Sequence, residues 1–151
     1  MIVYRLALEK YAASLFSSGV ANRWNRNGQH VIYSSENASL CALELLAHTN
    51  GIRPAGKFSL MRIEIAEPII PHVVELANLP EHWHHLSSYA LTQKIGSDWY
   101  NSRKSLCMRV PSVIVPSERN YVINTVHHDF IGKVRLVDTQ DFFWDNRFPS
   151  R

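Results

Sequence analysis

The stretch 31-VIYSSENASLCALELLAH-48 holds the clearest strand and the clearest helix of the sequence. Its first three residues are β-branched or aromatic, which predicts a short buried strand. The polar residues that follow offer three candidate helix caps: Ser34, Ser35 and Asn37. Asn50-Gly51 is a typical helix end, so we expect a helix over 38–48. This helix is apolar almost all round, and we therefore predict that it is buried.

Short strands and helices alternate on both sides of this stretch. Strands are expected over 2–6, 58–65, 106–110, 121–123 and 133–137, and helices over 9–17 and 86–104, the last with a break at Gly96. Within 58–65 the alternation places Met61, Ile63 and Ile65 on one face. The pattern predicts one α/β or α+β domain over 1–151 with a mixed central sheet.

Composition excludes several classes of protein. The 151 residues are 46% hydrophobic and 11% aromatic, which is typical of a packed domain and not of a disordered chain. No apolar run approaches the ~20 residues that span a bilayer. The apolar N-terminus meets Glu9 and Lys10 too soon for a secretory leader, so we expect a soluble, cytoplasmic protein without membrane contact. Cys41 and Cys107 have apolar neighbours and are predicted to be buried free thiols.

The charge balance is mildly basic, with 16 Lys and Arg against 13 Asp and Glu. The basic residues are scattered and form no run like those of nucleic-acid-binding tails. A basic pocket for a small phosphorylated ligand fits this distribution as well as a nucleic-acid face does.

Glu44 is the most informative single residue. On a helix its neighbours at three and four residues are Leu40, Cys41, Ala47 and His48. A carboxylate in this setting is at least half buried and needs a partner. It is either part of a structural ion pair or a carboxylate aimed into a cleft, where it binds a hydroxyl or stabilises a positive charge.

Two further candidates lie near this helix. Arg23 stands in the polar loop 20–30, where a guanidinium suits the capture of phosphate or carboxylate, although a surface loop with Trp24 in the core fits equally. Tyr33 ends the strand, a position where ligands bind in α/β sheets. A core tyrosine with a hydrogen-bonded hydroxyl fits the pattern equally well.

Other catalytic motifs are weak or missing. Ser112 stands in 111-PSVIVP-116, an extended segment that leaves its hydroxyl able to be presented, but no nucleophile elbow surrounds it. The histidine clusters 82–85 and 127–128 match no standard zinc spacing, so no metal site is expected. The sequence has neither a Walker loop nor a dinucleotide glycine fingerprint.

Taken together, these segments resemble the RES domain, a toxin family named for its Arg, Glu and Ser residues. The matching motifs are, in order, Tyr4-Arg5, Arg23-Trp24-Asn25 with Gly28, 31-VIYSS-35, Leu43-Glu44, Gly96 with Trp99, Val110-Pro111-Ser112, Glu118, Asn120-Tyr121, Asn124, His127 with Asp129-Phe130, and 143-FWDNR-147. They cover nearly the whole chain, and their order and spacing are specific together. The chain departs from the family at Ala21-Asn22, where two glycines are usual, and at Thr125, where proline is usual.

The resemblance implies a fold related to ADP-ribosyltransferases and a chemistry on NAD, which is a substrate, with no cofactor. It implies the following site: Arg5 and Arg23 at the phosphates, Tyr33 at the nicotinamide-ribose end, Glu44 at the ribose, Ser112 on the nicotinamide side, and Asn120 as a further substrate-binding member. Of these, Glu44, Arg23 and Tyr33 are the catalytic set. The resemblance also implies an Xre-type antitoxin partner with a helix-turn-helix region, in a complex where the chain could form a homodimer.

These roles agree with the chemistry of glycosidic bonds. Cleavage between nicotinamide and ribose builds positive charge on the ribose, which a carboxylate stabilises. The acceptor stays open: water, phosphate or, in protein ADP-ribosylation, a protein. The alternative from another class is a small basic nucleic-acid-binding module, which salt-sensitive DNA binding would support.

Overall fold

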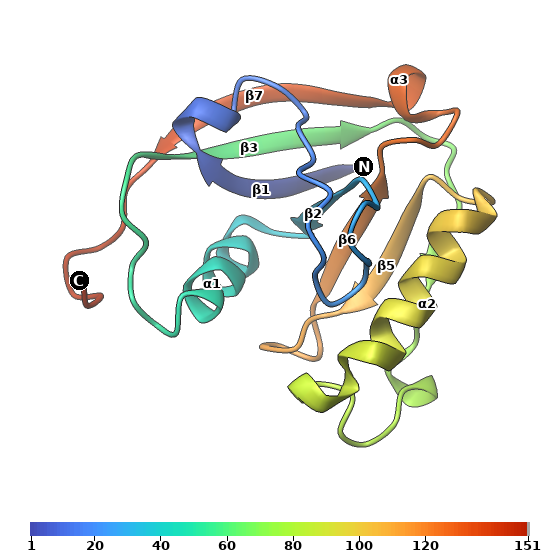
Figure 1. The fold of residues 1–151 in the computed structure, drawn as a ribbon. Coiled ribbons are helices and arrows are strands. Elements are labelled where there is room, and N and C mark those ends of the chain that lie inside the picture. Colours follow the sequence, from blue (N-terminus) through green and yellow to red (C-terminus); the bar gives the residue numbers. More distant parts are fainter. Residues whose placement is uncertain (151) are drawn as a thin grey trace.

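A seven-stranded mixed sheet forms the centre of the computed structural model, which describes residues 1–150 (Figure 1). The strands are β1 (Ile2–Leu8), β2 (Val31–Ser35), β3 (Phe58–Ile65), β4 (His72–Val73), β5 (Cys107–Pro111), β6 (Arg119–Asn124) and β7 (Val134–Phe142). They lie in the order β4-β5-β6-β2-β1-β3-β7, and only β4 and β5 pair in parallel. The predicted α+β domain with a mixed sheet is confirmed.

The sheet turns sharply at its middle. The strands β1, β3 and β7 run across Figure 1, whereas β2, β6 and β5 run steeply through it. The two halves meet where β1 pairs with β2, at Tyr4 and Ser35. By contrast, β1 and β3 pair along seven consecutive positions, Ile2 to Leu8. Arg5 lies on β1, and Tyr33 and Asn120 lie on β2 and β6, so the predicted site residues come from both halves.

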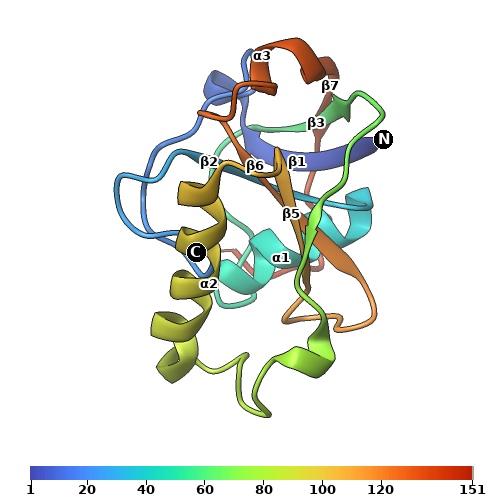
Figure 2. The same cartoon turned by 90° about the vertical axis from the view of Figure 1, so that its right-hand side faces the viewer.

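Two helices flank this turn: α1 (Ala38–His48) and α2 (Tyr89–Ser102) (Figures 1 and 2). The bounds of α1 are those predicted, and Asn37, rather than Ser34 or Ser35, is the cap: its Oδ1 accepts the Leu40 N–H at 2.7 Å. The prediction that α1 is a buried helix holds for one side only, because Leu40, Cys41 and Leu46 are buried but Leu43 is 40% exposed. Only one side of the helix packs on the sheet, so its other side faces solvent.

The second predicted helix begins later and has no break. A short 3-10 turn, Leu86–Ser88, leads into α2, which passes through Gly96 without interruption. A Cβ at Gly96 would lie 1.8 Å from the Trp24 carbonyl oxygen, so this glycine permits close packing of α2 on the Arg23 loop. The expected helix over 9–17 is reduced to the 3-10 turn Glu9–Tyr11, and a third short helix, α3, spans Phe130–Lys133.

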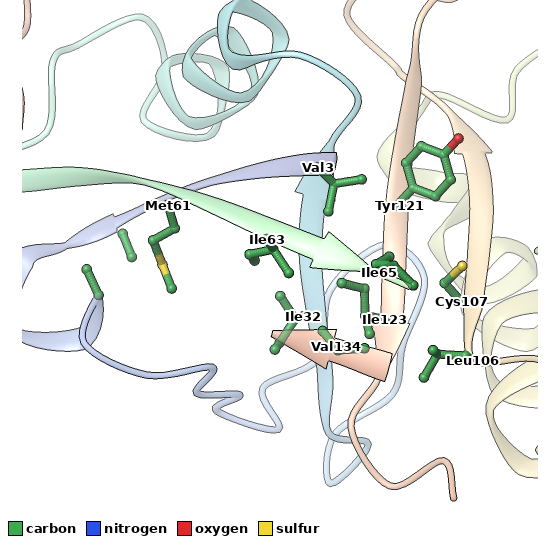
Figure 3. Close-up of a cluster of buried hydrophobic side chains, with 12 residues drawn as sticks. Val3, Ile32, Met61, Ile63, Ile65, Leu106, Cys107, Tyr121, Ile123 and Val134 are labelled. Atoms are coloured by element: carbon green, nitrogen blue, oxygen red, sulfur yellow. The ribbon is translucent and has the colours of Figure 1, made fainter. Parts of the chain in front are cut away.

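The main core lies between the two halves of the sheet (Figure 3). Met61, Ile63 and Ile65 of β3 are fully buried, as the alternation predicts, and they meet Ile32 and Ile123 from the other half. Cys41 and Cys107 are buried free thiols, which confirms that prediction. This core therefore packs one half of the sheet against the other.

Candidate functional site

A cavity of about 380 Å³ lies at the gap between the two halves of the sheet. Five of the six predicted site residues line it: Arg5 from β1, Arg23 from the loop 20–30, Tyr33 from β2, Glu44 from α1 and Asn120 from β6. The sixth, Ser112, directly follows β5. It does not line the cavity, but its hydroxyl donates a hydrogen bond to Glu44. Residues spread over more than 100 positions of the sequence therefore come together in one site.

Glu44 is half buried on the side of α1 that faces this cavity. One of its carboxylate oxygens, Oε1, accepts two hydrogen bonds, from Ser112 Oγ at 2.7 Å and from Asn120 Nδ2 at 2.6 Å. Within the described part of the chain, the other oxygen, Oε2, accepts none. The carboxylate is thus held in one orientation with an oxygen left for a ligand.

Ser112 is fully buried and does not present its hydroxyl as the sequence suggested. Its oxygen accepts the backbone N–H groups of Ile114 and Val115, each at 3.0 Å. A serine hydroxyl has a single proton, and here that proton is donated to Glu44. The geometry therefore makes Ser112 a support for the carboxylate; its contact with the nicotinamide side stays a prediction.

Asn120 reaches Glu44 through an arrangement that sequence reasoning missed. The buried hydroxyl of Ser35 donates to Asn120 Oδ1 at 2.7 Å, which turns the amide nitrogen toward Glu44. The sequence marks Ser35 as a candidate helix cap and as part of the 31-VIYSS-35 motif, but no local signal marks its contact with a residue 85 positions away. The register of β2 on β6, which pairs Ser35 with Asn120, brings the two together.

Arg23 is fixed by the segment that precedes α2. Its two terminal nitrogens donate to the carbonyls of Trp83 and His84, at 3.0 and 2.9 Å. The guanidinium also lies 4.6 Å from the centre of the Tyr89 ring, a cation–π contact. Each terminal nitrogen carries a second N–H group, so Arg23 can hold this segment and still donate to an anion in the cavity.

Tyr33 is held by the same loop as Arg23. Its hydroxyl donates to Asn25 Oδ1 at 2.8 Å and accepts the Trp24 N–H at 2.9 Å. Burial raises the pKa of Tyr33 well above its ordinary value, so this hydroxyl stays protonated. The ring, rather than an ionised oxygen, is what Tyr33 offers to a ligand.

Arg5 is the second cation at the cavity. Nη1 donates to the Phe16 carbonyl at 2.6 Å, and within residues 1–150 its other N–H groups have no protein acceptor. Burial lowers the pKa of this guanidinium, although arginine remains charged in proteins. A half-buried cation with free donors is suited to binding an anionic ligand.

The buried thiol of Cys41 also faces the cavity. Burial raises its pKa to about 12, and its sulfur accepts the Leu6 N–H at 3.0 Å. Because the thiolate is the nucleophilic form, Cys41 is not poised to attack a substrate.

The histidines lie outside this cavity, with the exception of His48. His127, His128 and Asp129 are the described residues whose ligand atoms converge, within 4.8 Å of one another. However, His127 Nδ1 accepts the Asp129 N–H, and Lys133 Nζ lies 3.2 Å from the Asp129 carboxylate. A cation at this position would meet the charge of Lys133, so the set gives no support for a metal centre.

Comparison with known proteins identifies the family to which this chain belongs. The chain matches the RES domain family over residues 2–145. It belongs to the RES domain family. This RES domain is 34% identical to "Toxin Res" of Photorhabdus laumondii and 32% identical to "Toxin Res" of Yersinia enterocolitica, each over 97% of this chain and at least 96% of the relative. It is also 34% identical to the "Prs ADP-ribosylating toxin" of a Sphingobium species, over 76% of this chain and 73% of that protein.

Solved structures confirm the fold of this RES domain. A chain from the crystal structure of the M. tuberculosis MbcT–MbcA toxin–antitoxin complex superposes with a TM-score of 0.71 at 14% identity, covering 93% of this chain and 83% of that one. Within residues 1–150, no helix of the RES domain has the length and apolar character needed to cross a membrane.

Proposed function

We propose that this RES domain is the toxin of a toxin–antitoxin pair and that it degrades NAD by cleaving the bond between nicotinamide and ribose. The observation that carries the proposal is the Glu44 carboxylate, with Oε1 held by Ser112 and Asn120 and Oε2 free at a cavity that holds two arginines. The full-length relatives named "Toxin Res" support the toxin role.

The arrangement suits a reaction that develops charge on a sugar. When the glycosidic bond breaks, its electron pair moves to the pyridinium nitrogen, and nicotinamide leaves as a neutral molecule. The positive charge passes to the ribose, where the fixed Oε2 of Glu44 stabilises it. Nicotinamide needs no general acid because it is already cationic. Arg5 and Arg23 would hold the pyrophosphate.

The acceptor divides this proposal into three reactions. Water gives hydrolysis and phosphate gives phosphorolysis. Transfer to a protein is the second candidate, favoured by the relative named "Prs ADP-ribosylating toxin". The deciding experiment incubates the chain with NAD, with and without phosphate, and identifies the products by mass spectrometry. Free ADP-ribose indicates hydrolysis, and a phosphorylated ADP-ribose indicates phosphorolysis. NAD that stays intact in all conditions, protein extract included, would contradict the proposal.

The partner in this proposal is an Xre-type antitoxin with a helix-turn-helix region. The similarity in fold to a chain of a toxin–antitoxin complex supports an antitoxin partner. Within such a complex, the proposal includes a homodimer of the toxin. An enzyme that consumes NAD would act in the cytoplasm, and a partner that fills the cavity would keep it inactive until release.

A further inference from the structure

A second cavity, of about 960 Å³, adjoins the first at the C-terminal end of α1. It lies between the loop 49–57 and the C-terminal segment 141–150, which come together in Figure 1 and are joined by the hydrogen bond from Arg53 N–H to the Pro149 carbonyl at 2.8 Å. His48 lines both cavities. Because Glu44 and His48 are four residues apart on one helix, the second cavity begins one helical turn from the carboxylate.

Several polar groups in this second cavity have no partner within the described chain. The indole Nε1 of Trp144 is buried without an acceptor, which is costly unless something supplies one. Lys57 and Asp141 also line the cavity, and neither side chain makes an ion pair in residues 1–150. Lys57 and Asp141 thus offer a ligand one cation and one carboxylate.

The second cavity also offers an aromatic surface. Phe143 lines it with 83% of its surface exposed, so its ring is accessible to a ligand. Its neighbour Trp144 is held edge-on by Phe58, Phe142 and Phe148. A flat ring resting on Phe143 would cover this exposed surface.

We propose that the second cavity binds the adenosine-phosphate half of NAD, an inference that rests on the proposed function. The adenine stacks on Phe143, and Asp141 accepts a hydrogen bond from the ribose hydroxyls. Lys57 adds a cation on the adenosine side of the pyrophosphate that Arg5 and Arg23 hold from the first cavity. His48 stands where the ligand passes from one cavity to the other. The first cavity, near the lower limit of the roughly 300–1,000 Å³ of ligand pockets, then holds the nicotinamide half.

The test compares two substrates that share the scissile bond. Nicotinamide mononucleotide contains the nicotinamide-ribose bond and one phosphate but no adenosine. Phe143→Ala should lower the ratio of kcat/KM for NAD to kcat/KM for the mononucleotide by about tenfold or more, since base stacking is lost. The matched control is Ile131→Ala, which truncates a side chain that is 93% exposed on α3, away from both cavities, and should leave this ratio as it is in the wild type.

A binding measurement decides the site without any catalysis. AMP should bind the wild type and the Ile131→Ala variant equally in calorimetry and at least tenfold more weakly to Phe143→Ala. Absence of AMP binding to the wild type, or an NAD preference that Phe143→Ala and Ile131→Ala share, would overturn the nucleotide site. Failure of the wild type to consume NAD would instead contradict the proposed function, and the AMP measurement would still decide the cavity.

Discussion

The hydroxyl of Ser112 donates to the carboxylate of Glu44 at 2.7 Å across 68 residues of sequence. Asn120 donates to the same oxygen, so both neighbours act on Oε1 and neither on Oε2. This asymmetry separates the two oxygens into one that fixes the side chain and one that remains for a ligand. Within residues 1–150, Glu44 forms no structural ion pair, the alternative interpretation of this residue, since both of its partners are neutral.

Replacing Glu44 with glutamine tests the charge and keeps the shape. The amide oxygen of Glu44→Gln can accept both hydrogen bonds from Ser112 and Asn120, so the variant should fold. It lacks the negative charge that stabilises the ribose cation in the proposed reaction, so NAD consumption should fall by about 10²-fold or more. Circular dichroism and thermal melting report folding, and NAD loss reports activity. A folded variant with full activity would remove Glu44 from the mechanism.

Arg23 has a geometric task that lysine cannot perform. Its two terminal nitrogens reach two backbone carbonyls at once, those of Trp83 and His84. A lysine ammonium is a point charge without this fork, so Arg23→Lys should fail to restore NAD binding and should loosen the segment before α2. Calorimetric titration with NAD, or with ADP-ribose if turnover interferes, measures the loss. Wild-type affinity in Arg23→Lys would contradict a role at the phosphates.

The local elements were predictable because their causes are local. The Asn37 cap and the Asn50-Gly51 end define α1, and alternation along 58–65 defines β3, so both elements have the predicted bounds. The predicted break at Gly96 is wrong because the cause of this glycine is not local. A glycine inside a helix weakens it locally, but here it is required by a backbone that approaches from another part of the chain.

The site residues were predictable as a set, but their contacts were not. The resemblance to RES domains names all six as one site, and the structure brings five of them to one cavity. The resemblance gives no sign that Ser112 is buried and donates to Glu44. Two hydrogen bonds, from Ser35 to Asn120 and from Asn120 to Glu44, depend on the register of β2 on β6, which is a property of the folded sheet. The second cavity depends on the return of the C-terminal segment to the loop 49–57.

Gly96→Ala should destabilise the domain and disturb the site together. The new methyl group would lie 1.8 Å from the Trp24 carbonyl oxygen, so α2 and the Arg23 loop must move apart. Overpacking of this kind costs about 1–3 kcal/mol. Gly132→Ala is the matched control, since a Cβ there meets nothing within 4 Å. Urea denaturation of both variants measures the difference, and equal stability would show that the packing adjusts.

The two buried thiols should be unreactive in the folded protein. Burial raises the pKa of Cys41 and of Cys107 to about 12, so at pH 8 both stay protonated. A thiol-specific reagent should label neither until urea unfolds the chain. A raised folded-state pKa also means that the thiols favour folding below about pH 8.5, their ordinary pKa, and lose this contribution as pH rises toward 12. Rapid labelling of native protein at pH 8 would contradict this burial.

The proposed loss of NAD should make this chain depend on an antitoxin partner. An enzyme that drains NAD harms its own cell, so the chain should be toxic when it is expressed alone. Co-expression of the antitoxin, expected from the neighbouring gene, should relieve the toxicity. Arg5 and Arg23 both line the cavity, so the blocking segment should present a carboxylate there. Substituting that carboxylate by its amide should weaken the block.

The readout is growth of cells with NAD measured in parallel. Wild-type chain should stop growth and lower NAD, and Glu44→Gln should do neither, even without the antitoxin. This pairing separates the proposed chemistry from harm by mere overexpression, because the variant differs from the wild type only in one charge. Equal toxicity of the wild type and Glu44→Gln, or toxicity with NAD unchanged, would show that the harm has another cause.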